Sequence, residues 1–266
     1  MIDFLIEGNT NIKQSSEYQF WDLINKNILG NKLNIIACGG IDNVIKIVDG
    51  VYAKNKQPVI ANIDNGIQFP EKLVRLSNVI KDNNAINVYR GKLIGFEDLF
   101  LQFSYFLYWI FSVEFRNKQK FKDIENLVKD YKEYLYKDKE DSELLKKFID
   151  RYHNSDYNLS NEQLSAALLG IITYNYCYQK TFKISKGEYG PCWSNNCFDK
   201  NICCLYHTEN NKRVLNNIDK EHRCGLFANK KNIKDKLLEF YNYSQAKDLL
   251  IDAKKYFNEK GILVNF

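Results

Sequence analysis

The sequence predicts an α/β fold, a mostly parallel sheet flanked by helices, followed by a helical region that contains a Cys/His-rich segment. Over the first 100 residues, short apolar runs alternate with stretches in which apolar residues recur at helical spacing. Each apolar run passes into a polar residue or a glycine, as buried parallel strands do where they meet a loop. Strands that alternate with helices indicate βαβ units, and hence a parallel sheet.

The first strand of that sheet is expected at residues 3–7 (DFLIE), which end at Glu7 and Gly8. Three more apolar runs predict strands at residues 33–37, 58–63 and 85–89, and helical spacing predicts connecting helices at residues 16–29, 42–52 and 69–80. Parallel strands end at one edge of their sheet, and ligands of such folds bind there. The residues expected at this edge are Glu7, Cys38, Gly39, Gly40, Asp64 and Arg90.

Longer helices are expected after residue 96. They span residues 97–115, 120–136, 142–152, 161–182 and 233–257, and residues 262–266 follow as a candidate edge strand. Periodicity fails between residues 185 and 231, where Gly, Asn and Cys accumulate. We therefore divide the chain into an α/β domain (1–100), a helical region (101–184), a Cys/His-rich basic segment (185–231) and a C-terminal helix and tail (232–266).

Hydrophobic residues make up 45% of the chain and aromatic residues 14%, which is enough apolar surface for a core and excludes a wholly disordered protein. No apolar run reaches the length of a membrane span, and the N-terminus lacks the basic start and apolar stretch of a signal peptide. We therefore expect a cytoplasmic protein that does not enter a membrane, with cysteines that are reduced or bound to metal.

Two acidic residues follow neighbouring strands of the expected sheet, Glu7 after the first and Asp64 after the third. Because both strands end at the same edge, the carboxylates can converge, and Mg²⁺ binds one or two carboxylates together with water and phosphate oxygens. Taken singly, an acid in this position is more often a loop residue or a helix cap. Their order and spacing favour the metal site.

Three strings carry a family resemblance: FLIEGNTN at residues 4–11, IIACGGIDNV at residues 35–44 and VIANIDNG at residues 59–66. In this order they resemble the Toprim domain, most closely that of OLD-type and related Toprim effectors of bacterial phage defence, over residues 3–100. In that family a Glu and a pair of Asp hold Mg²⁺ for phosphodiester cleavage or transfer. The resemblance implies that Glu7 and Asp64 are catalytic residues and ligands of Mg²⁺ or Mn²⁺.

Two positions depart from the family's acidic pattern. Gly66 stands where the second Asp of the pair would be, and Asn11 stands where the opening motif often carries an acid. We expect a further acid from Glu97, as a catalytic residue, or from Asp98, as a metal ligand, since both follow the fourth strand. The alternative for these two residues is an acidic first helical turn, which the helix dipole favours.

A second constellation gathers five cysteines and two histidines within residues 192–224. Structural Zn²⁺ takes four Cys or His ligands, and loop-rich segments without a core of their own fold around such an ion. The expected ligands are Cys192, Cys197, Cys204 and Cys224, with Cys203 or His207 as substitutes. The alternatives are reduced cysteines in a small core or a redox-sensitive cluster.

The same segment is basic, with 12 Lys and Arg against 6 Asp and Glu between residues 180 and 236. A patch of this kind attracts phosphate backbones, although an excess of solvated surface lysines is the alternative. The residues expected to contact nucleic acid are Lys212, Arg213, Arg223, Lys230 and Lys231.

Two functional hypotheses follow. The first is a Toprim-like, metal-dependent nuclease or nuclease-derived effector that acts on nucleic acid, in bacterial anti-phage defence. The second is a catalytically inactive Toprim-fold binding or sensor subunit, which the Gly66 and Asn11 departures favour. The expected partners are nucleic acid, an ATPase or other subunit of a defence system, and a second copy of the chain.

Overall fold

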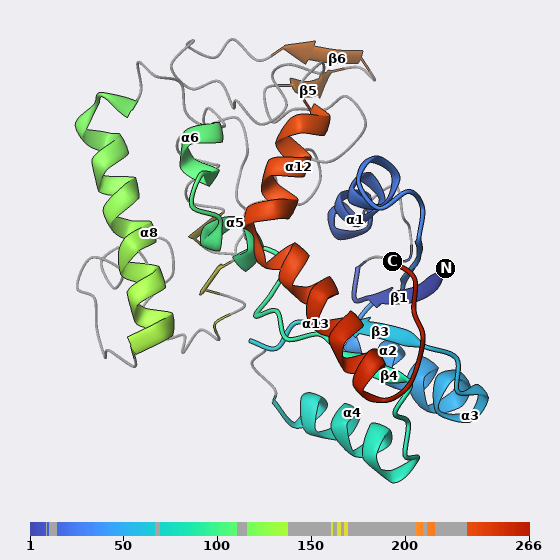
Figure 1. Ribbon diagram of the computed structural model, residues 1–266. Helices are drawn as coiled ribbons and strands as arrows, with labels where there is room; N and C mark the ends of the chain where they lie inside the picture. The colour runs from blue at the N-terminus through green and yellow to red at the C-terminus, as the bar shows by residue number, and fades with distance from the viewer. Residues whose placement is uncertain are drawn as a thin grey trace.

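The computed structural model describes residues 1–8, 10, 15–66, 70–110, 116–137, 161, 164–165, 168–169, 206–209, 212–215 and 233–266. Its central feature is a sheet of four parallel strands in the order β2-β1-β3-β4 (Figure 1). The strands are β1 (Ile2–Ile6), β2 (Leu33–Ala37), β3 (Val59–Asn62) and β4 (Val88–Arg90). The predicted α/β fold with a parallel sheet is thereby confirmed.

Helices join consecutive strands, as parallel pairing requires. The connection from β1 to β2 is α1 (Ser16–Asn27), and the connection from β3 to β4 is α4 (Glu71–Asp82). Between β2 and β3, where the sequence predicts one helix, the chain forms α2 (Ile41–Ile47), a π-helical turn η1 (Val48–Tyr52) and α3 (Ala53–Asn55). These connections bring the carboxyl ends of all four strands to one edge of the sheet.

Side chains alternate along the strands and divide the core between two faces of the sheet. Along β1, Phe4 and Ile6 point to one face and Leu5 points to the other. The face of Phe4, which we call the aromatic face, buries the rings of Phe20, Trp21, Phe96, Phe100, Phe103, Phe106, Phe240 and Phe257. The face of Leu5, the aliphatic face, is covered by α2, η1, α3 and α4 and buries Val44, Ile45, Val48, Tyr52 and Leu76.

The C-terminal helices belong to the same core as the sheet. In Figure 1, α13 (Gln245–Glu259), in red, lies against β4, whereas α12 (Ile233–Tyr243), in orange-red, extends beyond the sheet and packs against α1. The ring of Phe240 lies 5.4 Å from that of Phe20 and 5.0 Å from that of Phe100, between centroids, and Phe257 lies 6.5 Å from Tyr89 of β4. The α/β unit therefore includes residues from both ends of the sequence.

Two helices predicted as continuous are interrupted. The stretch at residues 97–115 contains α5 (Asp98–Gln102) and α6 (Phe106–Ile110), because Phe103 adopts an extended conformation (φ −70°, ψ 116°) that ends α5. The stretch at residues 233–257 breaks at Ser244, whose hydroxyl accepts a hydrogen bond from the Ala246 N–H (3.3 Å) and caps α13. Residues 262–266 form no strand, contrary to the prediction.

The remaining described elements are α8 (Gln119–Lys137) and an antiparallel pair of strands, β5 (Tyr206–Glu209) and β6 (Lys212–Leu215). The predicted helix at residues 142–152 lies outside the described residues, and of the one at 161–182 only residues 161, 164–165, 168 and 169 are described. Within the described part of the chain, no helix combines the length and apolarity needed to cross a membrane.

Candidate acidic site at the carboxyl edge of the sheet

Glu7 and Asp64 meet as the strand pattern predicts. Ile6 at the end of β1 lies opposite Asn62 at the end of β3, so the residues that follow the two strands are neighbours. The partly buried Glu7 carboxylate accepts a hydrogen bond from the backbone N–H of Asp64 (3.0 Å). This bond fixes the Glu7 side chain over the ends of two adjacent strands.

A third acid, Glu17, lies at the same edge and was not among the expected site residues. It occupies the first turn of α1, which begins where the chain leaves β1. One oxygen of its carboxylate accepts a hydrogen bond from the Gly8 N–H (3.1 Å), and the other accepts one from the Asn62 side-chain amide (3.3 Å). Glu17 therefore bridges the chain after β1 and the last residue of β3.

The surroundings of Glu17 strongly raise the pKa of its carboxyl. Burial, followed by repulsion from Glu7 and then from Glu97, raises its pKa from the ordinary 4.5 to about 8, against the opposing effect of its two hydrogen bonds. Burial also raises the pKa of Glu97. Glu7 and Glu97 thus lie close enough to Glu17 to raise its pKa, and the raised pKa favours its protonated form at neutral pH.

Glu97 and Asp98, adjacent in sequence, have different surroundings. Glu97 immediately precedes α5 and contributes to the field at Glu17. The Asp98 side chain is fully buried, and one of its oxygens accepts hydrogen bonds from the Tyr131 hydroxyl of α8 (2.6 Å) and the Gln102 amide (3.2 Å). Burial raises the pKa of Asp98. The hydrogen bonds of Asp98 therefore go to the helical region and not to Glu7 or Asp64.

The donor set at the edge suits a hard divalent cation in chemical type. Mg²⁺ prefers carboxylate and amide oxygens and keeps several waters. Besides the glutamates, the Oδ1 atom of Asn62 is buried and has no hydrogen-bond partner among the described residues, which makes it a spare oxygen donor. Within that part of the chain, however, no three Asp, Glu, His or Cys side chains are gathered around one point in a way that would hold a metal ion. The site fits Mg²⁺ in charge and donor type, and it lacks a preformed ligand shell.

The Cys38-Gly39-Gly40 turn lies beside this edge. The Gly39 N–H donates a hydrogen bond to the Gly8 carbonyl (2.9 Å), and the φ angles of Gly39 (+78°) and Gly40 (+123°) are ones that other residues rarely adopt. Burial, with smaller contributions from Glu17 and Glu7, raises the pKa of the Cys38 thiol to about 11. Cys38 is therefore protonated and packs as a small buried side chain.

The predicted zinc and nucleic-acid residues fall mostly outside the described residues. This holds for Cys192, Cys197, Cys203, Cys204, Cys224, Arg223, Lys230 and Lys231. His207 belongs to β5, and Lys212 and Arg213 belong to β6, where Arg213 pairs with Thr208 in the strand register. The zinc site stays a prediction.

No protein-family model, curated protein or solved structure matches this chain. The resemblance to Toprim domains therefore stays an expectation from the three sequence strings. What the site can do has to be argued from its residues.

Proposed function

We propose that this protein is a Toprim-like, Mg²⁺- or Mn²⁺-dependent nuclease that cleaves phosphodiester bonds in nucleic acid. The observation that supports the proposal most is the buried Glu17 at the carboxyl edge of the sheet, where burial and the nearby charges of Glu7 and Glu97 raise its pKa to about 8. Carboxylates that repel one another gain most when a cation takes the place of the proton they hold.

Each acid has a role in this proposal. Glu7 and Glu97 hold the cation, and Asp64, whose backbone already binds the Glu7 carboxylate, supplies a carboxylate from the neighbouring strand end. Glu17 would release its proton to solvent on cation binding and would then serve as a ligand or as a hydrogen-bond acceptor for a bound water. The cation would polarise the phosphodiester and lower the pKa of an attacking water.

The wider setting belongs to the same proposal. The basic segment with Lys212, Arg213, Arg223, Lys230 and Lys231 would hold the nucleic-acid backbone, and a structural Zn²⁺ would hold that segment together. The proposed context is bacterial anti-phage defence in the cytoplasm, with an ATPase or another defence subunit, or a second copy of the chain, as partner.

A second candidate function is a catalytically inactive binding or sensor subunit. It is favoured by one observation, that the described acids are not arranged as a set of three metal ligands. Gly66 and Asn11, which stand where the family carries acids, point in the same direction.

A cleavage assay separates the two functions. Plasmid DNA, single-stranded DNA and tRNA are incubated with Mg²⁺ or Mn²⁺ and the wild type, Glu7→Gln, Glu17→Gln or Glu97→Gln. Glu71→Gln, at an exposed position in the first turn of α4, is the matched control. Cleavage by wild type and control, and its loss by about 100-fold or more in Glu7→Gln and Glu97→Gln, is the expected result.

Two outcomes would contradict the nuclease. In the first, added Mg²⁺ raises the melting temperature of the protein, which shows that the metal binds, but no substrate is cleaved. The other is equal cleavage by wild type and Glu7→Gln, which would place the activity elsewhere. The first result would favour the binding subunit.

A further inference from the structure

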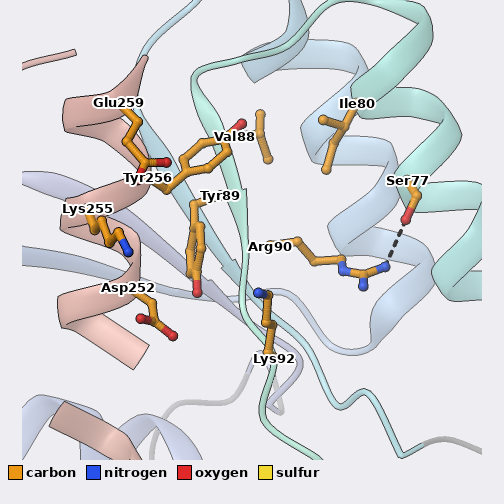
Figure 2. A pocket seen from close by; sticks show the side chains of 10 residues that line it. All are labelled: Ser77, Ile80, Val88, Tyr89, Arg90, Lys92, Asp252, Lys255, Tyr256 and Glu259. Carbon is orange, nitrogen blue, oxygen red and sulfur yellow. Dashed lines mark hydrogen bonds between the residues drawn. The ribbon is translucent and has the colours of Figure 1, made fainter. Parts of the chain in front are cut away.

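A groove of about 510 Å³ runs along the outer edge of β4, between α4 and α13. Figure 2 shows its walls, with Ser77 and Ile80 from α4 on one side and Asp252, Lys255 and Tyr256 from α13 on the other. Arg90 and Lys92 lie where β4 ends. The groove therefore opens toward the same edge of the sheet as the acidic site.

Arg90 is held in place by a neutral partner. Its guanidinium donates a hydrogen bond to the Ser77 hydroxyl (2.8 Å), and that hydroxyl donates in turn to the Leu73 carbonyl (2.8 Å) within α4. The side chain is half-buried, and among the described residues none of the ion pairs includes Arg90, Lys92 or Lys255. A guanidinium has five N–H donors, so an oriented Arg90 keeps donors for an anion.

The charge of the groove favours an anion. The residues that line the groove include three cations, Arg90, Lys92 and Lys255, and two carboxylates, those of Asp252 and Glu259, which leaves a net charge of one. A phosphodiester carries one negative charge, whereas a terminal phosphate carries nearly two at neutral pH. The positive charge of the groove therefore attracts phosphate groups of both kinds, and the choice of a phosphate inside a strand rests on the position of the groove.

The groove lies where a nucleic-acid strand bound in it could also reach Glu7 and Asp64. In the order β2-β1-β3-β4, Glu7 follows β1 and Lys92 follows β4, so two strand spacings, or about 10 Å, separate the chains that carry them. Asp64 follows β3 between the two. A single nucleic-acid strand lying along this edge would meet both.

We propose that Arg90 and Lys92 bind a backbone phosphate of a single-stranded nucleic acid, a neighbour of the phosphate at the acidic site. The choice of ligand rests on the proposed function, and the site itself rests on the groove. Binding to backbone phosphates carries no base preference and weakens as salt increases.

Binding measured without metal keeps this inference separate from the nuclease. A fluorescein-labelled single-stranded DNA and its RNA counterpart are titrated with protein in EDTA, and anisotropy is followed for the wild type, Arg90→Gln, Lys92→Gln and Lys54→Gln. Lys54 is exposed on α3, so Lys54→Gln is the control for the loss of one positive charge. Arg90→Gln is expected to weaken binding about tenfold and Lys92→Gln about threefold, with a shallower salt dependence in both.

The inference would be overturned if Lys92→Gln and Arg90→Gln bound the labelled strands as tightly as Lys54→Gln does. Because Lys92 is exposed, its variant should fold normally. Competition by AMP or inorganic phosphate as strong as by an unlabelled strand would overturn the choice of an internal phosphate. Failure of the nuclease gives a different pattern, in which binding depends on Arg90 and Lys92 while no substrate is cleaved.

Discussion

The two faces of the sheet are built from different parts of the chain. Among the residues that the structure describes, the helices on the aliphatic face lie between residues 41 and 82, in the connections that join β2, β3 and β4. The aromatic face combines α1 with α5, α12 and α13, which come from distant parts of the sequence. One face is completed locally, whereas the other depends on long-range packing.

This difference extends to the two sites. Glu17 and Glu97 are carried by α1 and by the turn into α5, both of which pack on the aromatic face. Arg90 is oriented by Ser77 of α4, which covers the aliphatic face. The acidic site should therefore respond to damage on the aromatic face, while the orientation of Arg90 should respond to changes in α4.

The largest effect is expected from Phe240→Ala. The Phe240 side chain is 1% exposed and its ring lies 5.0 Å from the rings of both Phe100 and Phe103, so its removal should lower the free energy of unfolding by about 3–5 kcal/mol. Urea denaturation measures the change. Leu238→Ala, on the same helix at a 42% exposed position, is the control and should change stability by about 0.5 kcal/mol at most. Similar losses in both variants would show that α12 does not complete the aromatic face.

The next largest effect is expected from Leu76→Ala, which tests how much the packing of the aliphatic face contributes to stability. Leu76 is fully buried in α4, and its truncation should lower the free energy of unfolding by about 2–4 kcal/mol. Because it lies on the opposite face from Glu17, the pH dependence of stability should keep its wild-type shape. A flattened pH dependence in Leu76→Ala would mean that the two faces are not independent.

Glu17→Gln should change stability through pH. The folded pKa of Glu17, about 8, lies above the ordinary 4.5, so between these values the folded state holds a proton that the unfolded state has lost. Stability contributed by this proton is therefore lost as pH rises from 4.5 to 8, at a rate of at most about 1.4 kcal/mol per pH unit. Glu17→Gln should remove this slope and be more stable than wild type at pH 8.

Melting temperatures recorded from pH 5 to pH 8 check this expectation, with Glu71→Gln as the exposed control. If Glu17→Gln is less stable than wild type at pH 8, burial of the Glu17 carboxyl and its repulsion by Glu7 and Glu97 do not destabilise the charged form as described. Added Mg²⁺ should raise the melting temperature of wild type more than that of Glu7→Gln, since a cation would relieve the same repulsion.

The smallest effect is expected from Ser77→Ala, which removes the acceptor that orients Arg90. A single hydrogen bond of this kind contributes about 0.5–1.5 kcal/mol, and the wild-type pH dependence should be retained. Thermal unfolding measures the loss, and Ser77→Thr, which keeps the hydroxyl, is the control. A loss much larger than that of Leu76→Ala would show that the Arg90–Ser77 contact is part of the core of α4.

The sheet could be predicted because its strands carry local signals. The apolar runs at residues 3–7 and 33–37 correspond closely to β1 and β2. The break at Phe103 could not be predicted in the same way, since an apolar run of helical spacing contains no local stop signal, and tertiary packing decides where α5 ends. Ser244 did offer a signal, as a capping residue inside an otherwise apolar stretch.

The site was partly predictable for a similar reason. Strand order brings Glu7 and Asp64 together, so their meeting follows from the βαβ pattern. Glu17 was missed because an acid in a first helical turn is common, although α1 begins at the carboxyl edge and its first turn must lie there. Nothing local distinguishes Glu97 from Asp98, and it is Tyr131 of α8 that draws Asp98 into the helical region.

The helices α12 and α13 are synthesised after the rest of the α/β unit, and this order affects how the nascent chain folds. A nascent chain can complete the aliphatic face once α4 and β4 have left the ribosome, but Phe20 and Phe100 lack their contact with the Phe240 ring until α12 follows. Exposed aromatic surface of this kind binds chaperones and aggregates. Translation products that stop before α12 should therefore be cleared by proteases and not accumulate as partly active protein.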